Sequence, residues 1–494
     1  MSGRRVANAW LGDLLAEAGW SGAELARAVN ALGTLHGLAL RYDRTAVAHW
    51  LSGTRPRRPV PELIAAALTE RCGRLVTVAE AGLGASSAGP GVRADPGAAA
   101  AEAGGEGLLR LALQARADVD PHGRPPLLRS PYQPVPVPPA LWDREPEPEA
   151  EPDPAAGGPG GGMRTRTGAG LPELAARRHL AAHAEQLRAL AVSFSGLYLT
   201  HGGVHTRAAL AAWLAQDAGA FAARHTDGPR SAAARGRGVA GQGCGVPEVW
   251  RGYAQLAHLL GEMTADAGYH GLAQEYHGIA LGLARQAGDR RMYAITLRAM
   301  SAHAGRLGQS AHAVRLARTA VETAPADGEP GTLAFLLVQR AAAHAHAGQR
   351  SAATADLAAA DRLHGRHALK PSDGPFDSYA RADLDFARAR THLALGEFPA
   401  AADALERSLR GRAAGQHRAT ALTHAALAET LLRLGHLTRA CEHWRAFLTA
   451  APAVQSRAVR EALGRLLRDL TPYRRMREAV PTVAMARALA DRLP

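Results

Sequence analysis

The sequence contains almost no lysine and almost no asparagine. Lys370 is the single lysine among 58 basic residues, and Asn8 and Asn30 are the only asparagines in 494 residues. Alanine, glycine, proline and arginine are abundant instead, a bias typical of a GC-rich genome such as that of an actinobacterium. The formal net charge of +13 is therefore weak evidence for a nucleic-acid partner, and only local arginine clusters are informative.

Cysteine is scarce too. Cys72, Cys244 and Cys441 lie far apart, without a CxxC pair or a neighbouring histidine at ligand spacing. This usage excludes a disulfide framework and a cysteine-based zinc site, and it fits a reducing compartment. No apolar run is long enough to cross a bilayer, and no apolar segment of the signal-peptide type follows the first arginines. We therefore expect a soluble cytoplasmic protein without a membrane partner.

Catalytic motifs are missing as well. The sequence has no Walker A motif, no Gly-x-Ser-x-Gly, no His-Glu-x-x-His and no dinucleotide-binding glycine pattern. The densest histidine pairs, in HGGVH (201–205) and HAH (344–346), lack the surroundings or the common helix face that a metal site needs. We expect no enzyme activity, no cofactor, no catalytic residues and no metal site.

The chain divides into five parts and is predicted to be all-α. Residues 1–84 form a patterned helical block, and residues 85–170 are rich in proline, glycine and acid, as expected of a disordered linker. Within that linker, LLRLALQAR (108–116) is expected to form only a transient helix. Helical hairpins with eroded repeat motifs are expected over 171–245, regular repeats over 246–470 and a helical tail over 471–494.

The repeats are recognised by five glycines, each between two helical segments. An alanine follows each glycine by five positions, and a small residue precedes it by seven. The glycines are Gly268, Gly308, Gly348, Gly396 and Gly435, and the alanines are Ala273, Ala313, Ala353, Ala401 and Ala440. Small residues at these offsets allow two antiparallel helices to approach closely, and glycine permits the tight turn between them.

This pattern resembles the tetratricopeptide repeat over roughly residues 250–455. The resemblance implies a superhelix of helical hairpins whose surface binds a protein or peptide partner.

Three or four short helices are expected in the N-terminal block. The first, 6–19, ends at Gly19, and Ser21 with Glu24 forms a capping box for the second, which Gly33 is expected to close. Asp43 is the N-cap expected for the third helix, RTAVAHWL (44–51), and Pro61 occupies the first turn of the fourth.

The third helix has two faces. Ala46, Val47, Trp50 and Leu51 share the face expected to dock on the block. The opposite side has no acidic residue and offers small hydrogen-bonding groups, as required to read base edges in a major groove. The segment TRPRR after the helix can hold phosphates. Residues 41–58 contain five arginines and one aspartate, a local charge of +4. The candidate DNA-binding residues are Arg44, Thr45, Ala48, His49, Ser52, Arg55, Arg57 and Arg58.

The order of these helices resembles the repressor-type helix-turn-helix domain, with Trp50, Gly53 and Pro56 at its characteristic positions. The connection between Gly33 and Asp43 is several residues longer than the tight turn of that motif. It therefore either extends the second helix or rebuilds the turn.

A helix-turn-helix followed by tetratricopeptide repeats also resembles two groups of regulators. One group is the large regulators of streptomycetes, including a family that represses sporulation and antibiotic production. The other is the peptide-pheromone receptors of Gram-positive bacteria, whose repeats use asparagines that this chain lacks after position 30. The first group fits better and implies a transcriptional regulator that binds double-stranded DNA. One helix-turn-helix rarely supplies enough specificity alone, so we expect a homodimer. The alternative is a repeat scaffold or peptide-sensing adaptor whose N-terminal block does not bind DNA.

Overall fold

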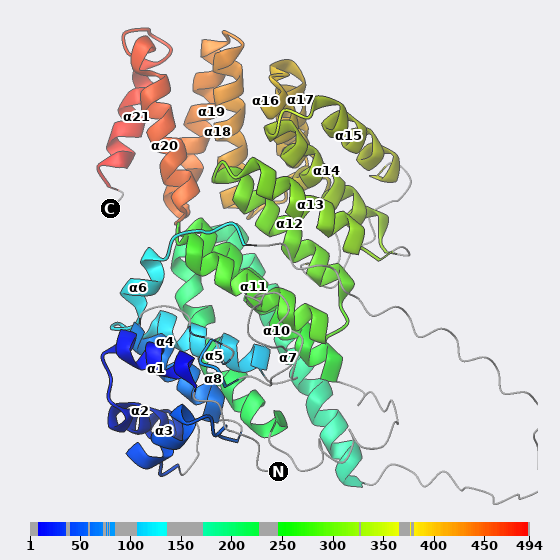
Figure 1. Cartoon of the computed structure of the whole chain (residues 1–494). Helices are drawn as coiled ribbons and strands as arrows, with labels where there is room; N and C mark the ends of the chain where they lie inside the picture. The colour runs from blue at the N-terminus through cyan, green and yellow to red at the C-terminus, as the bar shows by residue number, and fades with distance from the viewer. Residues whose placement is uncertain are drawn as a thin grey trace, which may run out of the picture.

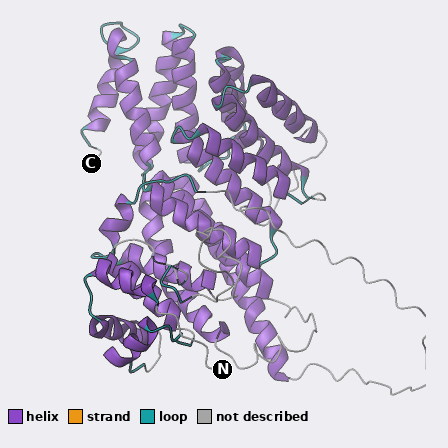
Figure 2. Ribbon diagram, viewed as in Figure 1, coloured by secondary structure: helices purple, strands orange, loops and turns teal. Residues whose placement is uncertain are grey.

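The computed structural model describes residues 8–35, 40–57, 60–72, 76, 78, 80–83, 106–135, 171–226, 246–325, 328–364, 376 and 380–492. These residues form α-helices and loops, and no strand occurs among them, so the fold is all-α as predicted (Figure 2). Helices α10 to α21 follow one another as stacked antiparallel pairs, and the N-terminal helices lie beside the first of these pairs (Figure 1).

The N-terminal block consists of α1 (Ala9–Ala18), α2 (Gly22–Leu35), α3 (Arg44–Leu51) and α4 (Val60–Cys72). Its core is a cluster of its own, to which all four helices contribute leucine, valine, isoleucine or tryptophan side chains. The predicted end of the first helix at Gly19 and the capping box are confirmed: Gly19 has φ 63°, and Glu24 accepts a hydrogen bond from the Ser21 amide at 2.7 Å. The predicted start at residue 6 is wrong, because Asn8 is the N-cap and α1 begins at Ala9. These caps satisfy backbone groups that a helix end otherwise leaves unpaired.

The prediction that Gly33 closes the second helix is wrong, because α2 continues to Leu35. A Cβ atom at position 33 would lie 2.5 Å from Cδ1 of Leu40, so this glycine makes room for a side chain that returns from the loop. Helix α2 is therefore extended by two residues beyond the glycine, and part of the long connection to α3 is helical.

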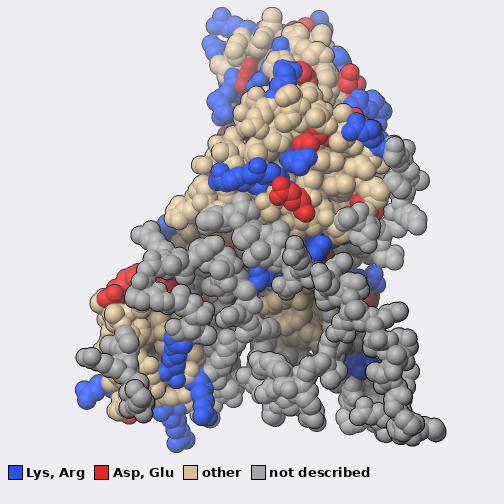
Figure 3. Space-filling model, turned by 45° about the vertical axis from the view of Figure 1, so that its right-hand side comes forward, with Lys and Arg blue, Asp and Glu red and all other residues tan. Residues whose placement is uncertain are grey.

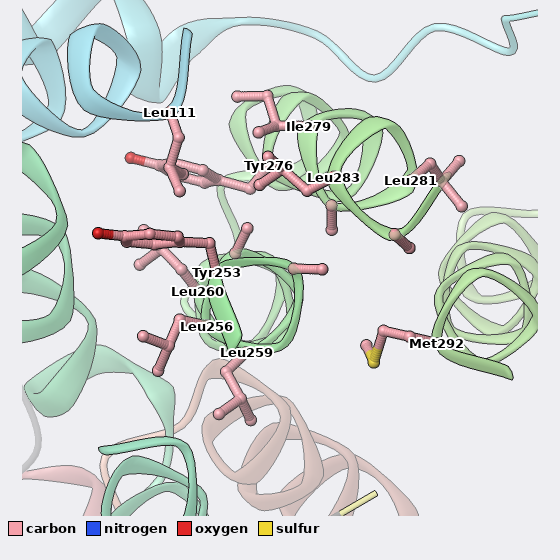
Figure 4. Close-up of a cluster of buried hydrophobic side chains, with 14 of the residues drawn as sticks. Leu111, Tyr253, Leu256, Leu259, Leu260, Tyr276, Ile279, Leu281, Leu283 and Met292 are labelled. Atoms are coloured by element: carbon pink, nitrogen blue, oxygen red, sulfur yellow. The ribbon is translucent and has the colours of Figure 1, made fainter. Parts of the chain in front are cut away.

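The predicted linker is also partly wrong. Helix α5 (Glu106–Val119) and helix α6 (Arg124–Arg129) are ordered, and α5 packs mainly on α8 (Gly203–Thr226). The segment 108–116 is thus a stable helix, because Leu108 and Leu111 are fully buried in the largest hydrophobic cluster of the molecule. Figure 4 shows Leu111 beside the rings of Tyr253 and Tyr276. The remaining linker positions, 85–105 and 136–170, lie outside the described residues.

A buried ion pair fixes α5 to the repeats. The Asp118 carboxylate of α5 bonds to the Arg207 guanidinium of α8 and accepts a hydrogen bond from the Tyr276 hydroxyl at 3.0 Å. Both charged side chains are almost completely buried. Because a buried charge without a partner is very unfavourable, this pair specifies where α5 docks.

The long helix α7 (Leu171–His201) and α8 precede the regular repeats. Helix α8 packs mainly on α5 rather than on α7. The pair that precedes the regular repeats is therefore formed by helices that are not adjacent in sequence. Residues 227–245, which complete the part expected to hold eroded hairpins, lie outside the described residues.

Six consecutive helical pairs follow. Their bounds are α10 (Val246–Asp266) with α11 (His270–Gln286), α12 (Arg290–Arg306) with α13 (Ser310–Thr323), α14 (Pro330–His346) with α15 (Arg350–His364), α16 (Arg381–Leu395) with α17 (Phe398–Arg410), α18 (His417–Arg433) with α19 (Leu437–Ala450), and α20 (Arg457–Asp469) with α21 (Val480–Ala490). Short 3₁₀ turns at Ala451–Ala453 and Thr471–Tyr473 connect the last helices.

The repeat register is confirmed at every predicted turn. All five turn glycines have positive φ, between 74° and 91°, and all five alanines that follow them are 0% exposed. The positive φ explains why glycine recurs at the turns, and the complete burial shows that the alanines lie where two helices touch. The C-terminal region is therefore a tetratricopeptide-like stack of hairpins.

Hydrogen bonds of one side chain also join the first helices of the stack to its last helices. Asp266, at the end of α10, accepts hydrogen bonds from the Gly203 amide at 2.9 Å, the Arg418 guanidinium at 2.6 Å and the Ser456 hydroxyl at 2.8 Å. These donors come from the start of α8, from α18 and from the residue before α20. One buried carboxylate thus joins the beginning of the stack to its end.

No helix among the described residues is long and apolar enough to span a membrane.

Candidate DNA-binding surface

Helix α3 begins where its sequence predicts. The Asp43 carboxylate accepts a hydrogen bond from the Ala46 amide at 2.9 Å, and this bond lowers the pKa of the carboxyl below its ordinary value. An N-cap of this kind satisfies an amide that the first turn of a helix otherwise leaves unpaired, and so it fixes where the helix begins. At the other end, the Thr54 amide donates to the His49 carbonyl at 2.9 Å, and Gly53 adopts φ 96°.

The two predicted faces of α3 are present. Val47 is 0% exposed and Trp50 is 4% exposed, so this side is part of the core of the block, with Ala46 and Leu51 partly buried beside it. The opposite side is exposed along its full length. Its residues are Arg44, Thr45, Ala48, His49 and Ser52.

The exposed side offers small and polar groups. The Thr45 side chain is exposed. The Ser52 hydroxyl donates a hydrogen bond to the His49 carbonyl at 2.8 Å, and its oxygen can still accept one. None of the exposed residues of α3 is acidic, and the carboxylate of Asp43, which precedes the helix, accepts a hydrogen bond from the Ala46 amide. The face can therefore approach a negatively charged polymer without a repelling carboxylate on its surface.

The Asn30 side chain holds the end of the long connection before α3. The Asn30 amide nitrogen donates to the Tyr42 carbonyl at 2.8 Å, and the Tyr42 amide donates to the Asn30 side-chain oxygen, also at 2.8 Å. The Tyr42 ring then meets Trp50 edge to face, with centroids 5.2 Å apart. These contacts place the start of α3 relative to α2, which resolves how the extended connection still leads into an ordered third helix.

Arginines flank α3 on both sides. Arg41 precedes it, and Arg55 and Arg57 follow it; all three are exposed. Arg58, the last candidate DNA-binding residue, lies outside the described residues. In Figure 3 several basic side chains project from the lower end of the molecule, where the N-terminal block lies.

Sequence reasoning missed two residues that build this surface. Asn8 caps α1 by accepting from the Leu11 amide at 3.2 Å, and its nitrogen donates to the Ala81 carbonyl at 2.8 Å. Asn30 organises the approach to α3 as described above. Both are found in the block, and the rarity of asparagine in this chain was the one signal that could have drawn attention to them.

The histidine pairs of the sequence lie on α7 and α8 and on α14. His201 is exposed at the end of α7, and His344 bonds to Gln349 at 2.5 Å while His346 is exposed on another side of α14. Within the part of the chain that the structure describes, no group of three or more histidine, cysteine or acidic residues is arranged to hold a metal ion.

Comparison with known proteins concerns the N-terminal block alone. Residues 11–84 match the family model described as the SP15 N-terminal domain. A search of curated proteins finds no match to the chain. The matched segment contains α1 except for its first two residues, and α2 to α4 in full. It therefore includes every candidate DNA-binding residue, and it ends before α5, the first helix that packs on the repeats.

Proposed function

We propose that this protein is a cytoplasmic transcriptional regulator that binds double-stranded DNA through α3 and a protein partner through its repeats. The observation that carries the proposal is the division of α3 into a buried side, with Val47 and Trp50, and an exposed side without acid. A helix held in this way presents side chains to a major groove while its other face keeps it rigid.

The candidate residues have separate roles. Thr45, His49 and Ser52 contact base edges, and the Ala48 methyl group meets a thymine methyl. Arg44, Arg55, Arg57 and Arg58 neutralise phosphates and set the position of α3 along the duplex. One helix reads only a few base pairs, so we propose that the protein binds as a homodimer on two half-sites.

The resemblance to streptomycete regulators extends this proposal to target genes of development or secondary metabolism. Chromatin immunoprecipitation with sequencing tests the proposal, with the wild-type protein compared with the T45A/H49A variant. For the wild type we expect discrete peaks that share a sequence motif. In the variant these peaks should disappear or no longer share the motif. Absence of enrichment by a folded wild-type protein would favour the alternative of a repeat scaffold.

A further inference from the structure

Helix α21 is apolar on the side that faces away from the stack. Its inner side carries Val483, Ala486 and Leu489, which are buried in a hydrophobic cluster shared with α18, α19 and α20. The opposite side is exposed, and we call it the outer face of α21. It consists of Val480, Pro481, Ala484, Met485 and Ala488. Arg487 is the one charged residue within α21.

Exposed apolar side chains are concentrated at this helix. Among the residues that the structure describes, eight large apolar side chains are exposed, and three of them are Met476 (49%), Val480 (49%) and Met485 (41%). The other five are distributed over α1, α5, α7 and the segment after α6. Figure 1 shows α21 at the outer edge of the stack, with no further helix on its outer side. A cluster of this kind marks an interaction site, whereas single exposed apolar residues are common.

The neighbouring helix α20 has the opposite character on its exposed side. The exposed positions of α20 carry charged side chains, namely Arg457, Arg460, Glu461 and Arg468. A helix with one charged side is typical of the protein surface, and a helix that is apolar on all sides is typical of one that is covered on all sides. The composition of α21 therefore indicates that its outer face is covered in the functional molecule.

Two opposite charges lie at equal distances from the middle of this face. Arg477 precedes Ala484 by seven residues, and Asp491 follows it by seven. Residues seven apart on a helix point to the same side within about 20°. The helical winding covers both positions, because the Val480 amide donates to the Met476 carbonyl at 3.1 Å and the Asp491 amide donates to the Arg487 carbonyl at 3.0 Å.

These two charges have no partner within the part of the chain that the structure describes. The side chains of Arg477 and Asp491 are exposed, and neither forms an ion pair or a hydrogen bond with another described residue. They are therefore available to a molecule that covers the outer face.

A second copy of the same helix fits this arrangement. When two copies cross antiparallel at Ala484, Arg477 of each copy faces Asp491 of the other. The apolar residues between them then face one another, as a two-fold interface requires of a single surface. A parallel pair would instead place each arginine against the same arginine of the second copy. The small side chain of Ala484 at the crossing allows the helix axes to approach to about 8 Å.

The remaining charges limit the strength of this contact. Glu478 and Arg492 lie next to the paired positions and bring one acid and one arginine to opposite ends of the helix. Arg474, Arg475 and Arg487 have no such counterpart, and they add positive charge to both copies. Because one helix pair is also a small interface, we expect a dissociation constant in the micromolar range.

We propose that the outer face of α21 binds the same face of a second copy of this chain, antiparallel and across a two-fold axis at Ala484. The inference rests on the proposed homodimer and names its interface. It does not require that the protein binds DNA.

The first test measures the dimer dissociation constant of the full-length chain by sedimentation at several concentrations, without DNA. R477D and D491R should each raise this constant at least about tenfold, because each change places like charges at both ends of the helix pair. The double variant R477D/D491R exchanges the two charges and should dimerise like the wild type. The control R460D reverses an exposed charge of α20, outside the proposed interface, and should also dimerise like the wild type.

The second test uses the symmetry of the contact. A cysteine at position 484 faces the same cysteine of the second copy, so A484C should form a disulfide-linked dimer under mild oxidation. The two residues at position 488 are separated by about 12 Å along the helices in this arrangement, so A488C should not. The wild type, which keeps the native cysteines, gives the background of the measurement.

Four results would overturn the proposal. They are a wild type that stays monomeric at every concentration, an R477D variant that dimerises like the wild type, an R477D/D491R variant that does not recover, and cross-linking of A488C as efficient as that of A484C. The first would leave the outer face to a different occupant.

Failure of the DNA-binding proposal would look different. A wild type that dimerises through α21 but enriches no sequence from a randomised DNA pool would contradict only the DNA-binding proposal. If both proposals hold, R477D should enrich a single half-site where the wild type enriches two.

Discussion

Asn30 holds Tyr42 by two hydrogen bonds, one given and one received, each 2.8 Å long. Asn30 lies on α2, and Tyr42 immediately precedes the N-cap of α3, so the pair joins the two helices of the candidate DNA-binding motif. The connection between them is longer than a tight turn, and this pair replaces the constraint that a short turn would supply. The orientation of the exposed face of α3 depends on it.

Replacing Asn30 by aspartate should weaken DNA binding and lower stability. A carboxylate can still accept from the Tyr42 amide, but it cannot donate to the Tyr42 carbonyl and would repel it. We expect a loss of about 1–3 kcal/mol in the free energy of unfolding of the block, measured by urea denaturation. The control S193A removes an exposed hydroxyl of α7 that donates to the Ala189 carbonyl of the same helix. Unchanged stability and DNA affinity of Asn30→Asp would show that the pair does not set the position of α3.

Arg55 and Arg57 should contribute to DNA affinity without contributing to sequence preference. Changing both to alanine should weaken binding to all duplexes by a similar factor and reduce the salt dependence by about one unit of slope per lost phosphate contact. The measurement is a titration of binding at several salt concentrations. R474A/R475A, a double variant of exposed arginines at the far end of the stack, is the control for net charge. An R55A/R57A variant that keeps the wild-type slope would exclude these arginines from the interface.

The close contact at Ala353 should not tolerate a larger side chain. Ala353 is 0% exposed at the predicted close-approach position, so Ala353→Leu should destabilise the repeats by about 1–3 kcal/mol through overpacking. Ala355 is exposed on the same helix, and Ala355→Leu should leave the thermal midpoint nearly unchanged. Equal midpoints for the two variants would contradict the register.

The buried ion pair of α5 should control the docking of that helix. Asp118→Ala leaves the Arg207 charge buried without its partner, and we expect a loss of about 3–5 kcal/mol. Hydrogen exchange of the α5 amides should accelerate, while exchange in the distant α18–α19 hairpin should not. Unaltered protection of α5 in this variant would mean that its leucines alone are sufficient for docking.

Buried histidines should make the repeats sensitive to acid. Burial lowers the pKa of His258 from 6.5 to about 3, so the unfolded chain binds a proton at pH values where the folded chain does not. Stability from this group is complete above about pH 6.5 and is lost as the pH falls toward the folded value. Between pH 7.5 and 5.5 the loss is about 1.4 kcal/mol for one such histidine. His258→Gln should reduce this pH dependence, and His436→Gln, at an exposed position, should not. Identical pH profiles of both variants and the wild type would contradict the assignment.

Local features were predictable from the sequence because they depend on neighbouring residues. The turn glycines, the buried alanines and the two faces of α3 follow from helical periodicity and from the conformational freedom of glycine. Gly33 was misread because its role is set by Leu40, which packs against it from beyond the turn. The composition around α5 resembles a linker. Its structural role is shown by the burial of its leucines and by its partners Arg207 and Tyr276, far along the chain.

The role of Asn30 belongs to the same class. A single polar residue within a helix gives no periodic signal, and its partner is the backbone of a residue twelve positions away. Long-range contacts of this kind become visible only in the folded molecule.

The central claim is that the exposed face of α3 reads a DNA sequence. The most direct measurement is enrichment of a randomised double-stranded DNA pool by the full-length protein, repeated with the T45A/H49A variant under the same salt conditions. The wild type should enrich a motif of two related half-sites, and the variant should bind with a similar salt slope but lose preference at particular base pairs, by about 1–3 kcal/mol per contact. A wild-type protein that is folded and enriches no sequence, or a variant that enriches the same motif with the same strength, would contradict the account.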